Sequence, residues 1–118
     1  MVAHVTTVAF EGIEAQYIDV QAQIVAGVPT FTVVGLPDKA VEESKDRVSS
    51  ALKNAGYQNP KQQNEKIVIS LSPAEVRKEG PYFDLAIAIA YLLAAGELVA
   101  DTESKLFLGA LSLSGELM

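Results

Sequence analysis

The chain has 118 residues, of which 49% are hydrophobic, and its 15 acidic and 9 basic residues give a formal net charge of −6. That length corresponds to one ordinary domain, and the apolar content is enough for a hydrophobic core, so intrinsic disorder is not expected. The chain lacks cysteine, which excludes disulfide scaffolds, zinc ribbons, iron–sulfur sites and cysteine nucleophiles, and its acidity excludes a broadly basic clamp on nucleic acid.

The first part of the chain is predicted to form three strands. Residues 3–10 and 30–34 are rich in β-branched and apolar residues, as is typical of strands. Between them, residues 16–26 alternate apolar and polar side chains, which predicts a strand with one face on the core and the other in water. The side chains expected to face the core in this middle strand are Ile18, Val20, Ala22 and Ile24.

A helix is predicted to follow, because small and apolar residues recur every three or four positions from Val41 to Ala55. Asp38 is expected to cap its N-terminus, since a short acidic side chain accepts hydrogen bonds from the free backbone N–H groups there. Gly56 is expected to end the helix, and residues 57–66 to form a polar loop.

A fourth strand, over residues 67–71, is followed by a second signal for the start of a helix. Ser72 is expected to be an N-cap and Glu75 to complete a capping box, with a proline at the first helical position between them. This pattern predicts one short turn of helix that ends at Gly80.

The last two predicted elements are a helix over residues 83–95 and a strand over residues 105–113. The helix is apolar on nearly every side, so it is expected to be enclosed in the core. Three predicted strands follow one another at the start of the chain, and one of them is half-exposed. This order indicates a mostly antiparallel or mixed sheet. The predicted fold class is therefore α+β, a two-layer α/β sandwich of about five strands with two main helices on one face.

Recognisable catalytic motifs are missing. The sequence contains neither a phosphate-binding Gly-Lys-Ser/Thr loop nor a dinucleotide-binding glycine fingerprint. Its single histidine, His4, is expected to be structural or on the surface, so no catalytic residue and no metal ligand is assigned. A divergent hydrolase, or a binder of a small phosphate ligand, that uses Ser70, Ser72 or Asp84 stays open as a weaker alternative.

The sequence carries no sign of export or membrane insertion. Residues 1–10 lack the basic region and the continuous apolar run of a secretory signal. The longest apolar run, residues 85–95, is far shorter than the roughly 20 residues needed to cross a bilayer. A cytoplasmic protein without membrane contact is therefore expected.

Residues 77–84 combine charge, glycine and proline just before the start of the apolar helix. The free N–H groups and the partial positive charge at such a place favour an anion, and Arg77 and Lys78 would add to that field. Alternatively, Gly80 and the following proline only turn the chain, and Asp84 caps the helix. Both interpretations are open at the level of sequence.

Several stretches resemble, in register and in order, the N-terminal domain of the ComM/YifB family of magnesium chelatase-like proteins. They run from the first predicted strand to the last residues, and together they are specific. The stretches are residues 31–38 with 41–44 and 47–48, residues 51–56, residues 71–80 with 83–85, and residues 108–115.

The resemblance implies the fold shared by the proteolytic domain of Lon protease and the GHMP kinases. It also implies that residues 1–118 form a single Lon-like N-terminal domain, a fragment of a longer chain with an AAA+ ATPase module downstream. ATP and Mg²⁺ are then expected in that module, and no cofactor in this segment. Family membership further implies a hexameric motor on DNA, linked to branch migration and natural transformation.

The likeness to Lon bears on catalysis. Lon-type proteases carry a nucleophilic serine just after a Gly-Pro at the start of the corresponding helix, but here Tyr82 stands at that position. A tyrosine there does not perform serine acyl chemistry. The partner lysine of the Lon dyad lies beyond the final strand, which this sequence does not reach. We therefore expect this segment not to be an enzyme, although its parent chain is expected to be an ATPase.

The function predicted from these observations is that of a non-catalytic domain for ring assembly and for contact with DNA or a partner protein. The candidate contact residues, expected to form a local basic patch, are Arg77, Lys78, Arg47 and Lys53. The main alternative is a pure interaction or oligomerisation module without DNA contact, which the net charge of −6 favours for the domain alone.

Overall fold

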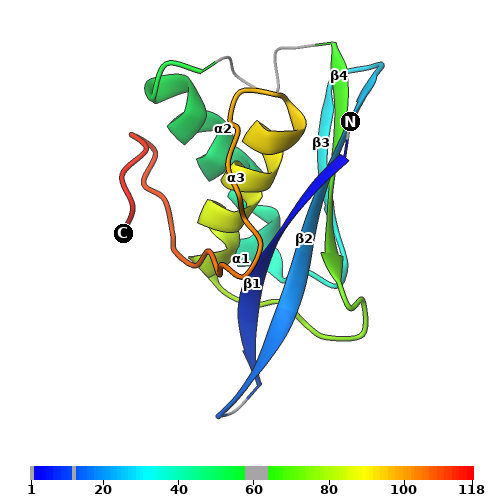
Figure 1. Ribbon diagram of the computed structural model, residues 1–118, viewed down its shortest axis with the longest axis vertical. Coiled ribbons are helices and arrows are strands. Elements are labelled where there is room, and N and C mark those ends of the chain that lie inside the picture. The colour runs from blue at the N-terminus through cyan, green and yellow to red at the C-terminus, as the bar shows by residue number, and fades with distance from the viewer. Residues whose placement is uncertain (1, 12, 58–63) are drawn as a thin grey trace.

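The computed structural model describes residues 2–11, 13–57 and 64–118, and it shows a sheet with helices on one face (Figure 1). The order of strands across the sheet is β1-β2-β4-β3. The pairs β1–β2 and β2–β4 are antiparallel, and β3 runs parallel to β4. The strands are β1 (Val2–Glu11), β2 (Glu14–Ala26), β3 (Thr30–Val34) and β4 (Glu65–Ser72).

The central strands follow from the alternation in the sequence. Val20 of β2 lies opposite Leu71 of β4, and Ala22 lies opposite Ile69. All four side chains are buried on the helix side of the sheet, and their neighbours along the strands face the open side. The predicted half-exposed strand is thereby confirmed. The polar loop expected over residues 57–66 lies largely outside the described residues.

The expected long helix after Asp38 is divided into two pieces. Its N-cap is confirmed, because an Asp38 carboxylate oxygen accepts a hydrogen bond from the backbone N–H of Val41 at 2.8 Å. The helix is interrupted at Glu43, directly before the buried side chain of Ser44. In the described part of the chain the helices are α1 (Lys39–Glu42), α2 (Ser44–Asn54) and α3 (Asp84–Ala94), and a short 3₁₀ turn, η2 (Pro81–Phe83), precedes α3.

The helix α3 is enclosed, as its composition predicted. It packs on β1 and β2 from one side and against α2 from another, and in Figure 1 the C-terminal segment crosses in front of it. Eight of its 11 residues are buried. On the side facing β3, the ring of Tyr91 stacks on Phe31 with centroids 6.4 Å apart.

The prediction of a capping box at Ser72 and Glu75 was wrong. Ser72 is the last residue of β4, paired with Asp19, and residues 73–76 form a turn rather than a helix. The reason is a competing backbone pairing further on: the N–H of Lys78 donates to the carbonyl of Leu36 at 3.1 Å, and the carbonyl of Lys78 accepts from the N–H of Asp38 at 2.9 Å. A helix would need those groups for bonds within the segment.

The strand expected over residues 105–113 also does not form, so the described residues contain four strands where about five were expected. This C-terminal segment touches β1 through one isolated bridge between Leu106 and Thr6. Beyond it, the N–H of Gly109 donates to the carbonyl of Tyr82, and the carbonyl of Gly109 accepts from the N–H of Leu85, each at 3.0 Å. Because these bonds go to the start of α3, the segment leaves the sheet edge. The α+β class and the two layers are confirmed.

Candidate functional site

A buried carboxylate at the start of α3 organises the most polar interior cluster of the described residues. Asp84 is fully buried and accepts hydrogen bonds from Ser44 Oγ at 2.5 Å and from Arg47 Nε and Nη2 at 2.7 and 3.0 Å. The backbone N–H of Leu111 adds a fourth at 3.1 Å. Asp84 therefore connects α2, α3 and the C-terminal segment, and it does not act as a helix cap.

The guanidinium of Arg47 donates hydrogen bonds to several groups within this cluster. Besides Asp84, its Nη2 donates to the carbonyl of Ala40 at 2.7 Å and to Ser44 Oγ at 3.1 Å. Hydrogen bonding to Asp84, partly opposed by burial, raises the pKa of the Arg47 guanidinium above its ordinary value. Both charges are thus paired and hydrogen-bonded, which is the arrangement that makes a buried ion pair tolerable. The four donors occupy the acceptor sites of Asp84 that a ligand would need.

Lys78 was expected on the surface, but it is fully buried. Its ammonium donates to the carbonyl of Pro73, and burial lowers the pKa of the amine. Arg77, by contrast, is exposed, and its guanidinium lies 3.0 Å from the carboxylate of Glu79. Neighbours in sequence therefore point in opposite directions, and the two cations do not present one anion site.

The expected basic patch is not assembled. Arg47 is committed to Asp84 and Lys78 to the interior, so Arg77 and Lys53 are left as exposed cations, the latter in the last turn of α2. The sequence signal for the buried role of Arg47 was present: Ser44, three residues after Val41 and three before Arg47, belongs to the small and apolar residues whose spacing predicted one buried helix face. A polar residue on such a stripe needs an interior partner, and Asp84 is that partner.

The open face of the sheet carries the other candidate polar residues. His4 Nδ1 lies 3.1 Å from an Asp19 carboxylate oxygen, and Gln21 Nε2 donates to the other oxygen at 2.8 Å. A shallow hollow of about 530 Å³ beside them is lined by residues that include Ser72 and Tyr17. Ser72 and Asp84 therefore belong to different layers of the fold, so the geometry does not combine them into one hydrolytic site.

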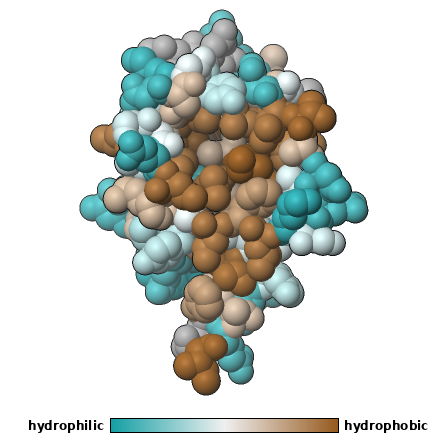
Figure 2. Space-filling model, turned by 60° about the vertical axis from the view of Figure 1, so that its left-hand side comes forward, coloured by the Kyte–Doolittle hydropathy of each residue, from teal (hydrophilic) through white to brown (hydrophobic). Residues whose placement is uncertain are grey.

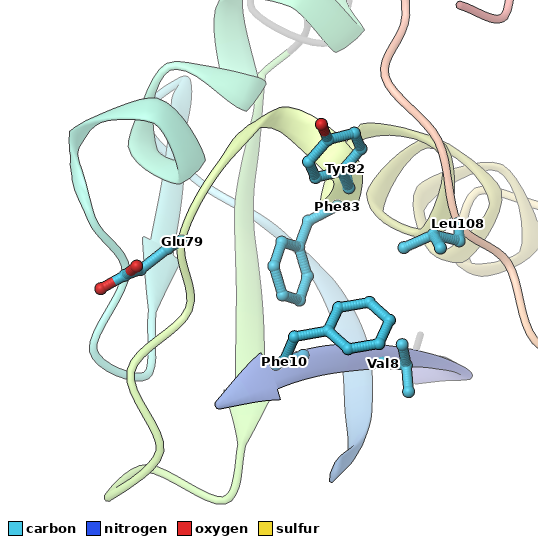
Figure 3. A pocket seen from close by; sticks show the side chains of 7 residues that line it. Val8, Phe10, Glu79, Tyr82, Phe83 and Leu108 are labelled. Carbon is cyan, nitrogen blue, oxygen red and sulfur yellow. The ribbon is translucent and has the colours of Figure 1, made fainter. Parts of the chain in front are cut away.

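A second hollow, of about 420 Å³, is more enclosed and mostly apolar. It lies between the C-terminal end of β1, the 3₁₀ turn before α3 and the C-terminal segment. In Figure 3 the rings of Phe10 and Phe83 approach each other across it, Leu108 extends toward it, and the carboxylate of Glu79 points away from the rings. We call it the β1 cleft, and its lining residues are Val8, Ala9, Phe10, Glu79, Tyr82, Phe83 and Leu108.

Two further observations limit the chemistry. In the described part of the chain, no three histidine, aspartate or glutamate side chains are grouped so that they could hold a metal ion. None of the helices that the structure describes is both long and apolar enough to span a membrane.

Comparison with known proteins gives consistent matches over nearly the whole chain. The protein family described as subunit ChlI of Mg-chelatase matches residues 20–118. The chain is 45% identical over 114 residues to the uncharacterized protein YifB of Escherichia coli, covering 96% of this chain and 22% of that protein. It is 41% identical over 107 residues to the competence protein ComM of Haemophilus influenzae, covering 90% and 20%. An uncharacterized protein of Mycobacterium tuberculosis is 38% identical over 110 residues, covering 92% and 21%. The chain thus spans about a fifth of the length of these curated relatives.

Proposed function

The chain belongs to the family of subunit ChlI of Mg-chelatase, with the similarity to YifB and ComM expected of the ComM/YifB proteins, and from that membership we propose that it is a non-catalytic interaction domain of an ATP-driven assembly. In this proposal ATP and Mg²⁺ bind a part of the protein outside these residues. The whole protein acts in the cytoplasm as a hexameric ring in DNA branch migration during competence, and this domain contributes contacts between subunits or with a partner.

The observation that carries the proposal is an exposed apolar face. Figure 2, which shows the side that bears the C-terminal segment, has apolar side chains gathered in the centre and hydrophilic ones around them. In that segment Leu106, Leu108 and Leu113 are 53%, 44% and 59% exposed. Contiguous apolar surface with a polar rim is typical of a surface that is covered by another protein.

Contact with DNA has less support within this domain. Two of its four candidate residues, Lys78 and Arg47, are engaged inside the protein. The domain also carries a net charge of −6, which disfavours a polyanion. Packing against protein is therefore the function that the geometry supports best.

The proposal is tested by replacing the apolar side chains and measuring assembly. Leu106→Ser combined with Leu113→Ser in the full-length protein is expected to reduce the fraction of full-size rings in analytical ultracentrifugation. Val28→Ser is the matched control, since Val28 is 79% exposed and lies in the turn between β2 and β3. If the double variant at Leu106 and Leu113 assembles like the wild type and like the Val28→Ser control, this face is not the assembly surface.

Contact with DNA is tested separately with the two cations that are exposed. If this domain touches phosphates, Arg77→Ala with Lys53→Ala in the full-length protein lowers DNA affinity and makes it less dependent on salt. The interaction role proposed here predicts that neither the affinity nor the salt slope changes.

A further inference from the structure

The outer edge of β1 is the starting point, because β1 is the first strand of the sheet and has a partner strand on one side. In an antiparallel pair, alternate residues turn their N–H and C=O groups toward the partner, and the others turn them outward. The carbonyl of Thr6 accepts from Phe107 of the C-terminal segment at 3.0 Å, which identifies Thr6 as an outward residue. Val8 and Phe10, two and four residues further on, are then outward as well.

The C-terminal segment covers this edge at Thr6 and then departs toward α3. Among the described residues, no donor or acceptor outside the strand pairs with the main chain of Val8 or Phe10. Natural proteins usually protect a free strand edge with a lysine, a proline, a bulge or a covering segment. At Val8 and Phe10 none of these is present: the register with β2 is unbroken and both side chains are apolar.

The free part of the edge borders the β1 cleft (Figure 3). Phe10 and Tyr82 are 66% and 58% exposed although they line a hollow, so the apolar walls are open to solvent. A strand laid beside Val8 and Phe10 would place alternate side chains into this cleft, just as bound peptides extend a sheet in strand-addition complexes. Backbone pairing and an apolar pocket are thus offered at the same place.

Charge distinguishes between possible occupants. Among the described residues that line the cleft, Glu79 is the charged one, and Glu14 lies next to Ala15, the residue opposite Phe10. Glu79 forms an exposed ion pair with Arg77, and an exposed pair of this kind can exchange Arg77 for another cation at little cost in free energy. A second copy of the chain would bring two such acidic edges and two net charges of −6 together. A segment carrying a basic residue complements this edge instead.

We propose that the free edge of β1 at Val8 and Phe10, with the β1 cleft, binds an extended segment of a partner protein that has alternating apolar side chains and a basic residue. The segment adds a strand to the sheet, its apolar side chains enter the cleft, and its basic residue lies near Glu79. This inference deepens the interaction role proposed above and rests on it. Neither Leu106 nor Leu113, the two residues that the assembly test changes, lines the cleft.

The experiment uses the 118-residue chain and a synthetic peptide of about ten residues that alternates valine with threonine and ends in lysine. Binding is measured by fluorescence anisotropy, and amide shifts by NMR. The amides of Val8 and Phe10 are expected to shift on binding. Val8→Pro removes one outward N–H and is expected to weaken binding about three- to tenfold, the value of one backbone hydrogen bond.

Val2→Pro is the matched control, because Val2 is also an outward residue of β1 but does not line the cleft. Its affinity for the peptide is expected to match the wild type. A peptide with N-methylated alternate amides tests the same pairing without changing the protein, and it is expected to bind at least about tenfold more weakly. Replacing the lysine by glutamate is expected to weaken binding to the wild type and to have less effect on Glu79→Gln.

Three results would overturn the inference: no peptide binding, equal affinity of the N-methylated and unmodified peptides, or self-association of the chain that Val8→Pro abolishes. The last would assign the edge to a second copy. Because the measurement uses a peptide and the short chain, its failure leaves ring assembly through Leu106 and Leu113 unaffected, and loss of assembly in those variants leaves peptide binding testable.

Discussion

Asp84 shows how a single buried carboxylate decides the local arrangement of three segments. Asp84 lies in α3, and its partners come from α2 and from the C-terminal segment. A charge in the interior is costly unless it is paired, so each partner is necessary for the others. The cluster therefore fixes one arrangement of these segments more than it adds net stability. Removing one partner lowers the free energy of unfolding because it leaves the other charge in the interior without a counter-charge.

We expect Asp84→Ala to lower the free energy of unfolding by about 3–5 kcal/mol, because it leaves the Arg47 guanidinium, 23% exposed, without its counter-charge. Urea denaturation followed by circular dichroism measures the change. The matched control is Glu79→Ala, which breaks the exposed pair with Arg77 and is expected to cost less than about 1 kcal/mol. Similar losses in the two variants would show that the buried pair has no special role.

Lys78 is the second interior charge, and its amine donates a hydrogen bond to the carbonyl of Pro73. Because burial lowers its pKa below the ordinary value of 10.5, the folded state binds fewer protons than the unfolded state between the two values. Stability therefore rises with pH across that window, from the lowered pKa up to 10.5, as this ammonium loses its proton.

Lys78→Met is expected to change the stability at pH 7 by less than about 1.5 kcal/mol, since the new side chain keeps much of the buried volume and removes a charge. It is also expected to remove the part of the rise in stability with pH that Lys78 contributes, measured as the difference between wild type and variant in urea titrations from pH 7 to pH 10. Lys78→Ala, which leaves a cavity, is expected to cost about 2–5 kcal/mol. A parallel pH dependence of Lys78→Met and wild type would contradict the burial of this charge.

At the scale of elements, the turn from β3 into α1 depends on the absence of one side chain. Gly35 follows β3 with a φ of +107°, and a Cβ placed there would lie 2.1 Å from the carbonyl oxygen of Leu71 in the neighbouring strand. Gly56, after α2, has a φ of +97° but open space around it. The two positions share the backbone conformation and differ in the contact.

The comparison of Gly35→Ala with Gly56→Ala therefore separates strain from collision. Gly56→Ala is expected to cost about 1–3 kcal/mol for the left-handed conformation alone. Gly35→Ala is expected to cost clearly more, since β4 must move away from β3, and its Tm is expected to fall further. Equal losses would mean that β3 and β4 separate at no cost.

The elements that the sequence predicted correctly are those whose pattern is local. The alternation in residues 16–26 and the apolar helix before Gly96 set which face is buried, and both elements form. The errors arose where distant backbone groups compete. Lys78 pairs with Leu36 and Asp38 rather than extending a helix from Ser72, and Gly109 bonds to the start of α3 rather than to β1. No local pattern encodes such partners.

The candidate site shows the same division. Asp38 was recognised as a cap because its partner is three residues away. The partner of Arg47 is 37 residues away, and the burial of Lys78 depends on how the turns after β3 and β4 meet, so charge alone suggested surface roles for both. A basic residue in a sequence predicts a surface position only when the fold offers it no buried carbonyl or carboxylate as a hydrogen-bond partner.

At the scale of the whole molecule, the fold has a firm centre and a C-terminal segment attached by few bonds. The centre is formed by β2, β4 and α3, where Val20, Ala22 and Ile69 are fully buried. Residues 105–118 lie over α3 and are attached by hydrogen bonds at Thr6, Tyr82, Leu85 and Asp84, and by those that Ser50 and Asn54 of α2 donate to the carbonyl of Leu113. Local opening is therefore expected to begin in this segment, which also bears the exposed leucines.

Native-state amide hydrogen exchange tests this order. The amides of Val20, Ala22 and Ile69 are expected to exchange most slowly, through global unfolding, while Leu111 exchanges faster through local release of the segment. Asp84→Asn weakens the acceptor of the Leu111 amide, and conditions are chosen in which the variant stays folded. The amides of Val20, Ala22 and Ile69 are expected to accelerate about tenfold more than that of Leu111, because global unfolding loses every contact of residue 84, whereas local release of the segment loses only its hydrogen bond to the Leu111 amide. Equal acceleration at every amide would mean that the segment opens only when the whole domain unfolds, and the apolar face would then be a rigid part of the domain.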